Sequence, residues 1–266
     1  MPVEFEFEMY GEREVRMPHF TGYLARGILL QAIRHVDPAA SQVLHEPNIR
    51  KAYAVTPLRF RSKARTGVGY ILDPEHPCWV GVRFLADDYA KLLLRCFESK
   101  QSFLIYDTTF RIASVKVKTK SYRKLWEEAK PVEAFRLYFQ TPTCFAALGQ
   151  KYYCLFPEPK RVFGNLLSLW NLYSDLKFDA QEKEDYLNWL GREVGVSGYS
   201  LETRQEPTGK GKAIGFTGWV AYRSGDNEKW QRLTNCLGSL AEYSNIGKNR
   251  TAGFGVAQCL ERRAGK

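Results

Sequence analysis

The chain has 266 residues, of which 44% are hydrophobic, 26% charged and 14% aromatic, a composition typical of a folded globular protein and not of a disordered tail or a fibrous repeat. Its 39 Lys and Arg outnumber its 29 Asp and Glu, giving a formal net charge of +10 that favours a polyanionic partner. The longest uncharged stretches, residues 137–150 and 162–174, are shorter than the roughly 20 apolar residues of a membrane-spanning helix, and the acidic start of the chain is unlike a signal peptide, so we expect a cytoplasmic protein with no membrane contact.

The first half of the chain alternates between strand and helix patterns. Strict alternation of acidic and apolar residues predicts a strand at 3–9, and apolar positions at helical spacing predict a helix at 20–36 that ends at Asp37-Pro38. The predicted elements of this half are a strand at 3–9, a helix at 20–36, a short helical turn at 41–45, strands at 52–61 and 78–85, a helix at 87–98 and one or two strands within 103–120. This order is that of a ferredoxin-like unit.

A polar joint at 127–131 is followed by a second series of the same kind. The predicted elements of this half are a strand at 132–139 ending in a turn at 140–143, helices at 163–176 and 179–190, strands at 198–204 and 213–222, a helix at 227–243 and a last strand at 253–261. We therefore predict an α+β protein made of two tandem ferredoxin-like domains, residues 1–127 and 131–266.

Two basic segments are candidate RNA-binding regions. Lys116, Lys118 and Lys120 alternate with apolar or small residues, so in a strand they share one face and could follow a nucleic acid backbone. The alternative is a solvated face whose lysines protect a sheet edge.

The second segment, Ser244–Val256, is glycine-rich and lies between the last predicted helix and strand. Gly247, Gly253 and Gly255 can adopt positive φ and bring backbone N–H groups close to an anion, while Lys248 and Arg250 add charge. The spacing fits neither a Walker loop nor a dinucleotide fingerprint. We interpret it as a phosphate-binding loop, with a tight structural turn as the alternative.

This loop carries a resemblance to a known family. Residues 240–244 (Leu-Ala-Glu-Tyr-Ser) run into 246–255 (Ile-Gly-Lys-Asn-Arg-Thr-Ala-Gly-Phe-Gly), which resembles the glycine-rich loop of the CRISPR repeat-processing endoribonucleases, the sixth Cas family of the repeat-associated RNA-binding superfamily. Three weaker segments in the same order support it: 44–46 with 51–58, 141–145, and 215–218. The resemblance covers nearly the whole chain.

The resemblance implies two ferredoxin-like domains, binding of CRISPR repeat RNA, and cleavage within each repeat without a metal or other cofactor. It also implies hand-over of the guide RNA to an effector complex. A homodimer is left open, because no heptad or isolated apolar stripe demands one.

Metal-independent RNA cleavage needs little from the protein. The 2′-OH of the substrate attacks the phosphate, so the site must supply a base, an acid and cations for the developing charge. Products would carry a 2′,3′-cyclic phosphate and a 5′-OH. Histidine suits the proton transfers because its ordinary pKa is near 6.5, and the chain has 4 histidines. The six cysteines and these histidines show no metal-ligand spacing, so we expect reduced thiols and no metal site.

His45 is the leading catalytic candidate, since the family often places its histidine in this region, and Lys51 would stabilise the charged transition state. The alternative for His45 is a helix-end residue that interacts with the terminal carbonyls. Some members use a tyrosine on the first helix as a second proton-transfer group, and the matching position here is Leu30. His35 is therefore the candidate for that role. A non-catalytic RNA-binding subunit on the same fold is the alternative function.

Overall fold

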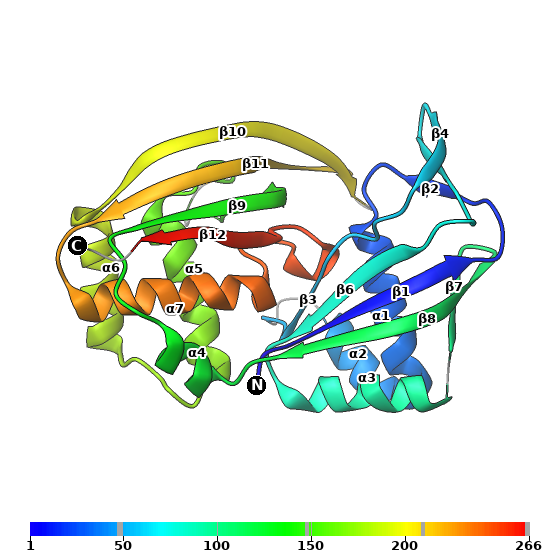
Figure 1. Ribbon diagram of the computed structural model, residues 1–266, viewed down its shortest axis with the longest axis horizontal. Coiled ribbons are helices and arrows are strands. Elements are labelled where there is room, and N and C mark those ends of the chain that lie inside the picture. The colour runs from blue at the N-terminus through cyan, green and yellow to red at the C-terminus, as the bar shows by residue number, and fades with distance from the viewer. Residues whose placement is uncertain (47–49, 100, 147–148, 150, 209–210, 264–266) are drawn as a thin grey trace.

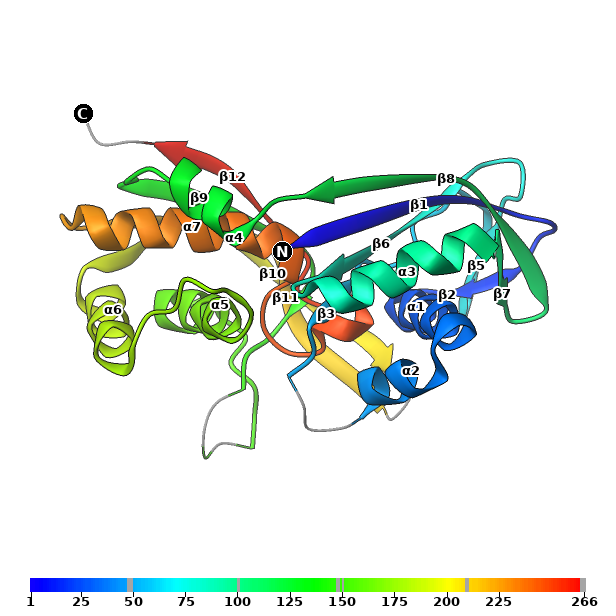
Figure 2. The same ribbon diagram turned by 90° about the horizontal axis from the view of Figure 1, so that it is seen from below.

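The computed structural model describes residues 1–46, 50–99, 101–146, 149, 151–208 and 211–263 and confirms the α+β class, with two tandem ferredoxin-like units. Each unit has an antiparallel sheet with helices on one side, and both sheets keep their open faces on the same side of the molecule (Figures 1 and 2).

The first unit forms a sheet of five strands in the order β3-β6-β1-β8-β7. Its strands and helices are β1 (Val3–Gly11), α1 (Gly22–Val36), α2 (Pro38–His45), β3 (Tyr53–Val55), β6 (Cys78–Phe84), α3 (Asp87–Ser99), β7 (Ser102–Ile105) and β8 (Thr108–Thr119). The alternation predicted for β1 is seen in its burial, because Phe5 and Phe7 face the helices and are 1% exposed, whereas the glutamates between them face outward.

The second unit forms a sheet of four strands in the order β10-β11-β9-β12. Its elements are β9 (Ala134–Thr143), α5 (Pro159–Tyr173), α6 (Ala180–Arg192), β10 (Val194–Thr208), β11 (Gly211–Ser224), α7 (Glu228–Ser244), the 3-10 turn η1 (Arg250–Ala252) and β12 (Ala257–Arg263). In both units the first and third strands are central, which is the ferredoxin-like arrangement.

Three regions differ from the sequence-based prediction. The strand predicted over 52–61 is confined to β3, and a small sheet, not predicted, is formed by β2 (Arg16–Pro18), β4 (Ser62–Thr66) and β5 (Gly69–Leu72). The turn predicted at 140–143 is wrong, because β9 continues to Thr143. Pro142 is tolerated there because the pairing of β9 with β11 shifts register at this point, where no ladder N–H is needed.

The segment between the two units is helical, although only a polar joint was predicted there. Helix α4 (Tyr122–Glu128) begins after Ser121, whose hydroxyl accepts a hydrogen bond from the Lys124 N–H. Tyr122 and Leu125 are buried in the core of the second unit, and the Tyr122 hydroxyl donates to the Leu85 carbonyl of the first unit. The joint therefore connects the two units through buried contacts.

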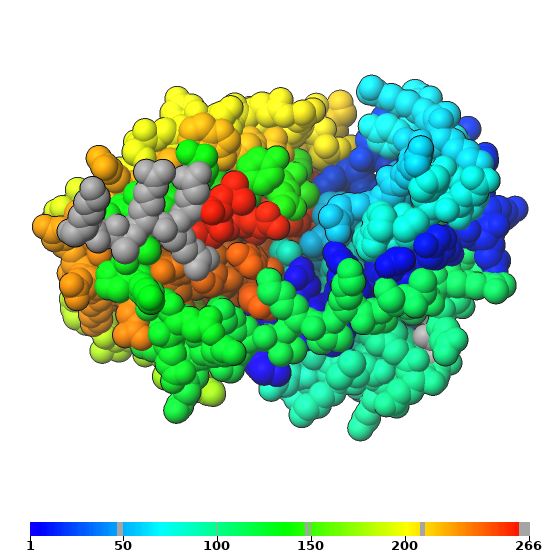
Figure 3. Space-filling view, in the orientation of Figure 1, coloured from blue at the N-terminus to red at the C-terminus, as the bar shows by residue number. Residues whose placement is uncertain are grey.

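Two large cores stabilise the units, and a third, smaller cluster joins them. The small cluster contains Phe20 before α1, Ala213 of β11, and Ala252 and Phe254 of the glycine-rich loop. Phe20 and Phe254 have ring centroids 4.6 Å apart. The glycine-rich loop of the second unit is thus packed against the start of α1 in the first, where Figure 3 shows the two halves in contact.

Candidate RNA-binding and cleavage site

The glycine-rich loop is shaped by backbone conformations that its glycines permit. Gly255 has φ +71°, and a Cβ there would collide with the Ile246 carbonyl oxygen. Gly253 has φ +80°, and a Cβ there would meet Gly22 of α1 at 3.0 Å. Side chains at these positions would push the loop away from itself and from α1.

The amide groups of these glycines are used inside the protein, which differs from the predicted phosphate cradle. Gly247 N–H donates to the Asn165 side-chain oxygen (3.0 Å), Gly255 N–H to the Pro142 carbonyl (3.1 Å) and Gly253 N–H to the Arg250 carbonyl (3.2 Å). An amide already paired in this way gives no hydrogen bond to an anion. The glycines therefore fix the loop, and these three amides are not available to an anion.

Arg250 also differs from its predicted role as a phosphate-binding cation. Its side chain is buried, and its guanidinium donates to the Ser244 carbonyl (2.6 Å) and to the Lys51 carbonyl (2.9 Å). Burial lowers the pKa of Arg250 to about 10, which still leaves it protonated at neutral pH. Arg250 thus joins the glycine-rich loop to the segment before β3.

Asn245 is a second buried residue that connects the glycine-rich loop to the first unit, and the sequence analysis missed it. It is fully buried, has φ +54°, and its amide nitrogen donates to the carbonyls of Val55 (2.9 Å) and Phe254 (3.0 Å). Its side-chain oxygen accepts from Arg83 of β6 (2.8 Å), which also pairs with Glu4. An Asn directly after a helix and two residues before a Gly is the local signal that could have identified it.

Lys51 lies where the two units meet. Its ammonium donates to the Val43 carbonyl (2.8 Å) near the C-terminal end of α2, so it lies close to the turn that carries His45. Burial lowers the pKa of Lys51, and Glu46 opposes this effect. The neighbouring backbone is held from the second unit, since the Tyr173 hydroxyl of α5 donates to the Arg50 carbonyl (2.6 Å).

A cleft of about 680 Å³ opens beside Lys51. It is lined by the glycine-rich loop, the segment before β3 and one side of α5. The cations among its described lining residues are Arg50, Lys51, Arg161, Lys248 and Arg250, and none of those lining residues is acidic. Such a surface favours phosphate groups.

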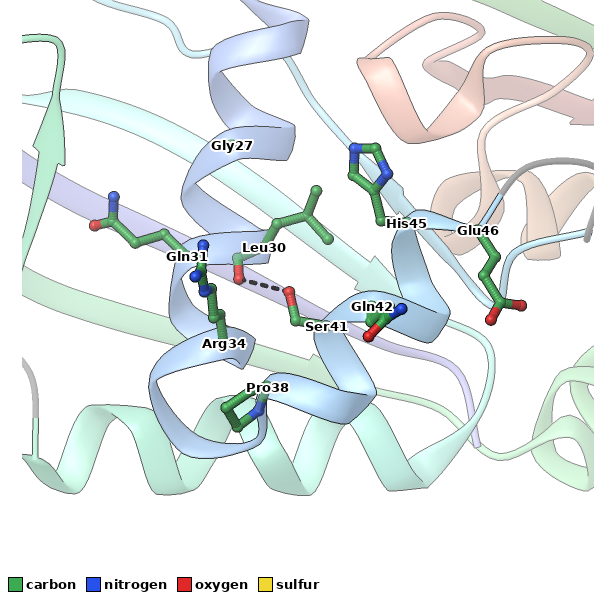
Figure 4. Close-up of a pocket in the computed structure, with 9 residues that line it drawn as sticks. All are labelled: Gly27, Leu30, Gln31, Arg34, Pro38, Ser41, Gln42, His45 and Glu46. Carbon is green, nitrogen blue, oxygen red and sulfur yellow. Dashed lines mark hydrogen bonds between the residues drawn. The ribbon is translucent and has the colours of Figure 1, made fainter.

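His45 lines a second, neighbouring cavity of about 800 Å³ between α1 and α2. Figure 4 shows the imidazole at the end of α2 on the side toward α1, with Glu46 pointing away. Leu30, Gln31 and Arg34 line the same cavity from α1. Leu30 therefore lies on the wall facing His45, at the position where the resemblance expects a tyrosine in some members.

His35 is not among the described residues that line this cavity. It is exposed in the last turn of α1, next to Arg34, on a neighbouring face of the helix. The structure thus places His45 and Lys51 at the same end of α2 and leaves His35 outside that group.

The lysines predicted on β8 lie on the open face of the first sheet, opposite acidic residues. Lys116 faces Glu6 and Lys118 faces Glu4 across the pairing of β8 with β1. Lys118 also forms an ion pair with Glu242 (3.4 Å), and Lys120 pairs with Glu128. Lys118 and Lys120 therefore have carboxylate partners. The glutamates of β1 themselves form ion pairs with Arg59 and Arg83.

Two absences hold for the part of the chain that the structure describes. No group of three or more His, Cys, Asp or Glu is arranged to hold a metal ion. No helix there is both long and apolar enough to cross a bilayer.

Comparison with known proteins points to one family. The model of the CRISPR-associated endoribonuclease Cas6 matches residues 137–257. A solved Cas6 product complex has a TM-score of 0.82 and 25% identity, covering 98% of this chain and 99% of the other. These matches support a CRISPR repeat-processing protein of the Cas6 family.

Other solved structures share this fold. Cas6 of Thermus thermophilus has a TM-score of 0.77 and 26% identity over 98% of each chain. A Cas6-related protein of Pyrococcus furiosus has a TM-score of 0.62 and 12% identity, covering 98% of this chain and 99% of the other, and shows the shared fold alone. Among curated protein sequences, none matches this chain.

Proposed function

We propose that this Cas6 protein binds CRISPR repeat RNA and cleaves precursor transcripts within each repeat to release guide RNAs. The observation that carries the proposal is the cationic cleft at the glycine-rich loop. Lys51 lines this cleft and also donates a hydrogen bond to the end of α2, which bears His45. Solved relatives include a product complex and a substrate-mimic complex of Cas6.

We further propose that the reaction uses general acid–base catalysis without a metal. The 2′-OH of the nucleotide before the cut attacks the phosphorus, the P–O5′ bond breaks, and the products carry a 2′,3′-cyclic phosphate and a 5′-OH. His45 transfers a proton at this centre, and Lys51 stabilises the charge that develops on the phosphate oxygens.

The lowered pKa of Lys51 also suits proton donation, because a weaker hold on the proton makes a better acid near neutral pH. Lys51 could thereby supply the group that Leu30 does not. His35, the candidate from the sequence for this second role, does not line the cavity of His45, so we assign the role to Lys51 instead. Hand-over to an effector complex, a homodimer and a cytoplasmic location stay predictions from the sequence.

The test is cleavage of a labelled RNA carrying the host's CRISPR repeat, in EDTA. The proposal expects full activity in EDTA, a cyclic-phosphate end on the upstream product, and no cleavage of an RNA with a 2′-deoxy nucleotide before the cut. Activity that vanished in EDTA and returned with magnesium would contradict the metal-independent mechanism. Tight binding of the repeat without any cleavage would instead favour a non-catalytic binding subunit.

A further inference from the structure

Two adjacent tyrosines, Tyr152 and Tyr153, lie exposed next to the cationic cleft. The side chain of Tyr152 is 77% exposed and that of Tyr153 is 47% exposed. Neither belongs to a hydrophobic core of the described residues. The Tyr152 ring therefore lies outside the cores that the described residues form.

Tyr153 contacts Lys248, a cation of the glycine-rich loop, through both its ring and its hydroxyl. The Lys248 ammonium lies 4.3 Å from the centre of the Tyr153 ring and 3.2 Å from its hydroxyl oxygen. Lys248 in turn lines the cleft together with Arg50 and Lys51. The exposed tyrosine pair thus continues the cationic surface that begins at Lys51.

The two tyrosines and Lys248 are fixed to the same short piece of chain at the end of β9. Phe145 and Cys154 exchange two backbone hydrogen bonds of 3.0 Å, which anchors the segment that carries the tyrosines. The Lys248 N–H donates to the Cys144 carbonyl, also at 3.0 Å. Ring and cation therefore keep a defined relative position before any ligand binds.

An exposed ring next in the chain to the tyrosine that positions an ammonium matches the chemistry of a single nucleotide. Unpaired RNA bases are bound chiefly by stacking on aromatic side chains, and a neighbouring Lys binds the phosphate of the same strand. The absence of acidic side chains among the described lining residues of the cleft favours a polyanion over a protein partner of mixed charge.

We propose that Tyr152 stacks an unpaired base of the repeat RNA whose phosphate is bound by Lys248, and that Tyr153 positions Lys248. This inference rests on the proposed function and adds a base-binding subsite outside the reacting centre. Because the subsite acts in binding, its loss should change affinity and leave the chemical step intact.

The test measures binding of a non-cleavable repeat RNA, 2′-deoxy before the cut, by fluorescence anisotropy. Tyr152→Ala should weaken binding about 30-fold, the middle of the range for one base–aromatic stack, and Tyr152→Phe should bind like wild type. Tyr106→Ala is the matched control, since Tyr106 is 57% exposed in the turn between β7 and β8, away from the cleft, and should have no effect.

Single abasic substitutions along the unpaired part of the same RNA then identify the base. One abasic position should weaken binding to wild type about 30-fold and cause no further loss with Tyr152→Ala. The single-turnover cleavage rate at saturating enzyme should be unchanged in Tyr152→Ala.

Wild-type affinity in Tyr152→Ala, or equal abasic penalties in both proteins at every position, would overturn the subsite. A lower saturated cleavage rate with unchanged affinity would overturn it as well. Failure of the proposed function is seen separately, as the absence of repeat binding or cleavage by the wild type.

Discussion

The lysines of β8 and the cations of the cleft were both predicted to contact RNA, yet their surroundings differ. On β8, Lys116 and Lys118 each face a glutamate of β1, because the alternation that aligns the lysines also aligns the glutamates. In the cleft, Lys248 and Lys51 are among lining residues that include no described carboxylate. The difference teaches that a row of like charges indicates a binding surface only when the strand paired with it is also considered.

The largest effect on stability and cleavage is expected for Arg250, a buried residue that lines the cleft. Arg250→Ala removes two charge-assisted hydrogen bonds to the Ser244 and Lys51 carbonyls and leaves the buried Ser244 carbonyl without this donor. We expect a loss of about 3 kcal/mol in the free energy of unfolding and a strong loss of cleavage, because Lys51 loses its support. Urea unfolding and single-turnover cleavage measure the two effects.

Arg232→Ala is the matched control for that substitution. Arg232 also donates to a carbonyl, that of Trp126 (2.9 Å), but on α7 away from the cleft. It should lose stability and keep its cleavage rate at temperatures where it is folded. If both variants lost cleavage equally at matched stability, the positioning role of Arg250 would be refuted.

A smaller effect is expected when one cation of the cleft and one of β8 are replaced in turn. Lys248→Ala should weaken RNA binding and reduce the slope of log K against log salt by about 1, because one phosphate contact is lost. Lys118→Ala should leave the slope unchanged, since Lys118 already pairs with Glu242 and lies over the Tyr243 ring. Filter binding over a salt series measures both slopes. Equal slopes for the two variants would contradict the claim that the cleft binds phosphate and the lysines of β8 do not.

The smallest effect is a shift in pH dependence. Burial lowers the pKa of Lys51, so its charge is lost at a lower pH than for an ordinary lysine. If that charge stabilises the transition state, cleavage should fall at alkaline pH, and Lys51→Arg should move this fall to higher pH because guanidinium stays protonated. Single-turnover rates across the alkaline range measure the shift. If the rate of Lys51→Arg fell at the same pH as that of the wild type, Lys51 would be excluded as the group whose deprotonation causes the fall.

The periodicity of the sequence predicted the units well, because most of their helices and strands have one face against a core. β1 and α7 are examples, since their apolar residues are the buried ones. The sheet of β2, β4 and β5 was missed because its strands are short and β4 is mostly exposed, so it shows no apolar alternation.

The site was only partly predictable for a related reason. His45 and Lys51 could be proposed from the sequence, but the buried roles of Arg250 and Asn245 depend on Lys51 and Val55, which are far from them in the chain. A charged residue in a glycine-rich loop gives no local signal of whether it turns outward to a phosphate or inward to carbonyls. Only the packing of the loop on α1 decides this.

The most direct test of the account is the single-turnover cleavage rate of His45→Ala, measured beside its affinity for the repeat RNA. We predict a fall of about 10²- to 10⁴-fold in rate, the usual contribution of a proton-transfer group, with affinity close to that of the wild type. His35→Ala, measured in parallel, should keep its rate, because His35 does not line the cavity of His45. A wild-type rate in His45→Ala would contradict the assignment of the catalytic centre to the end of α2.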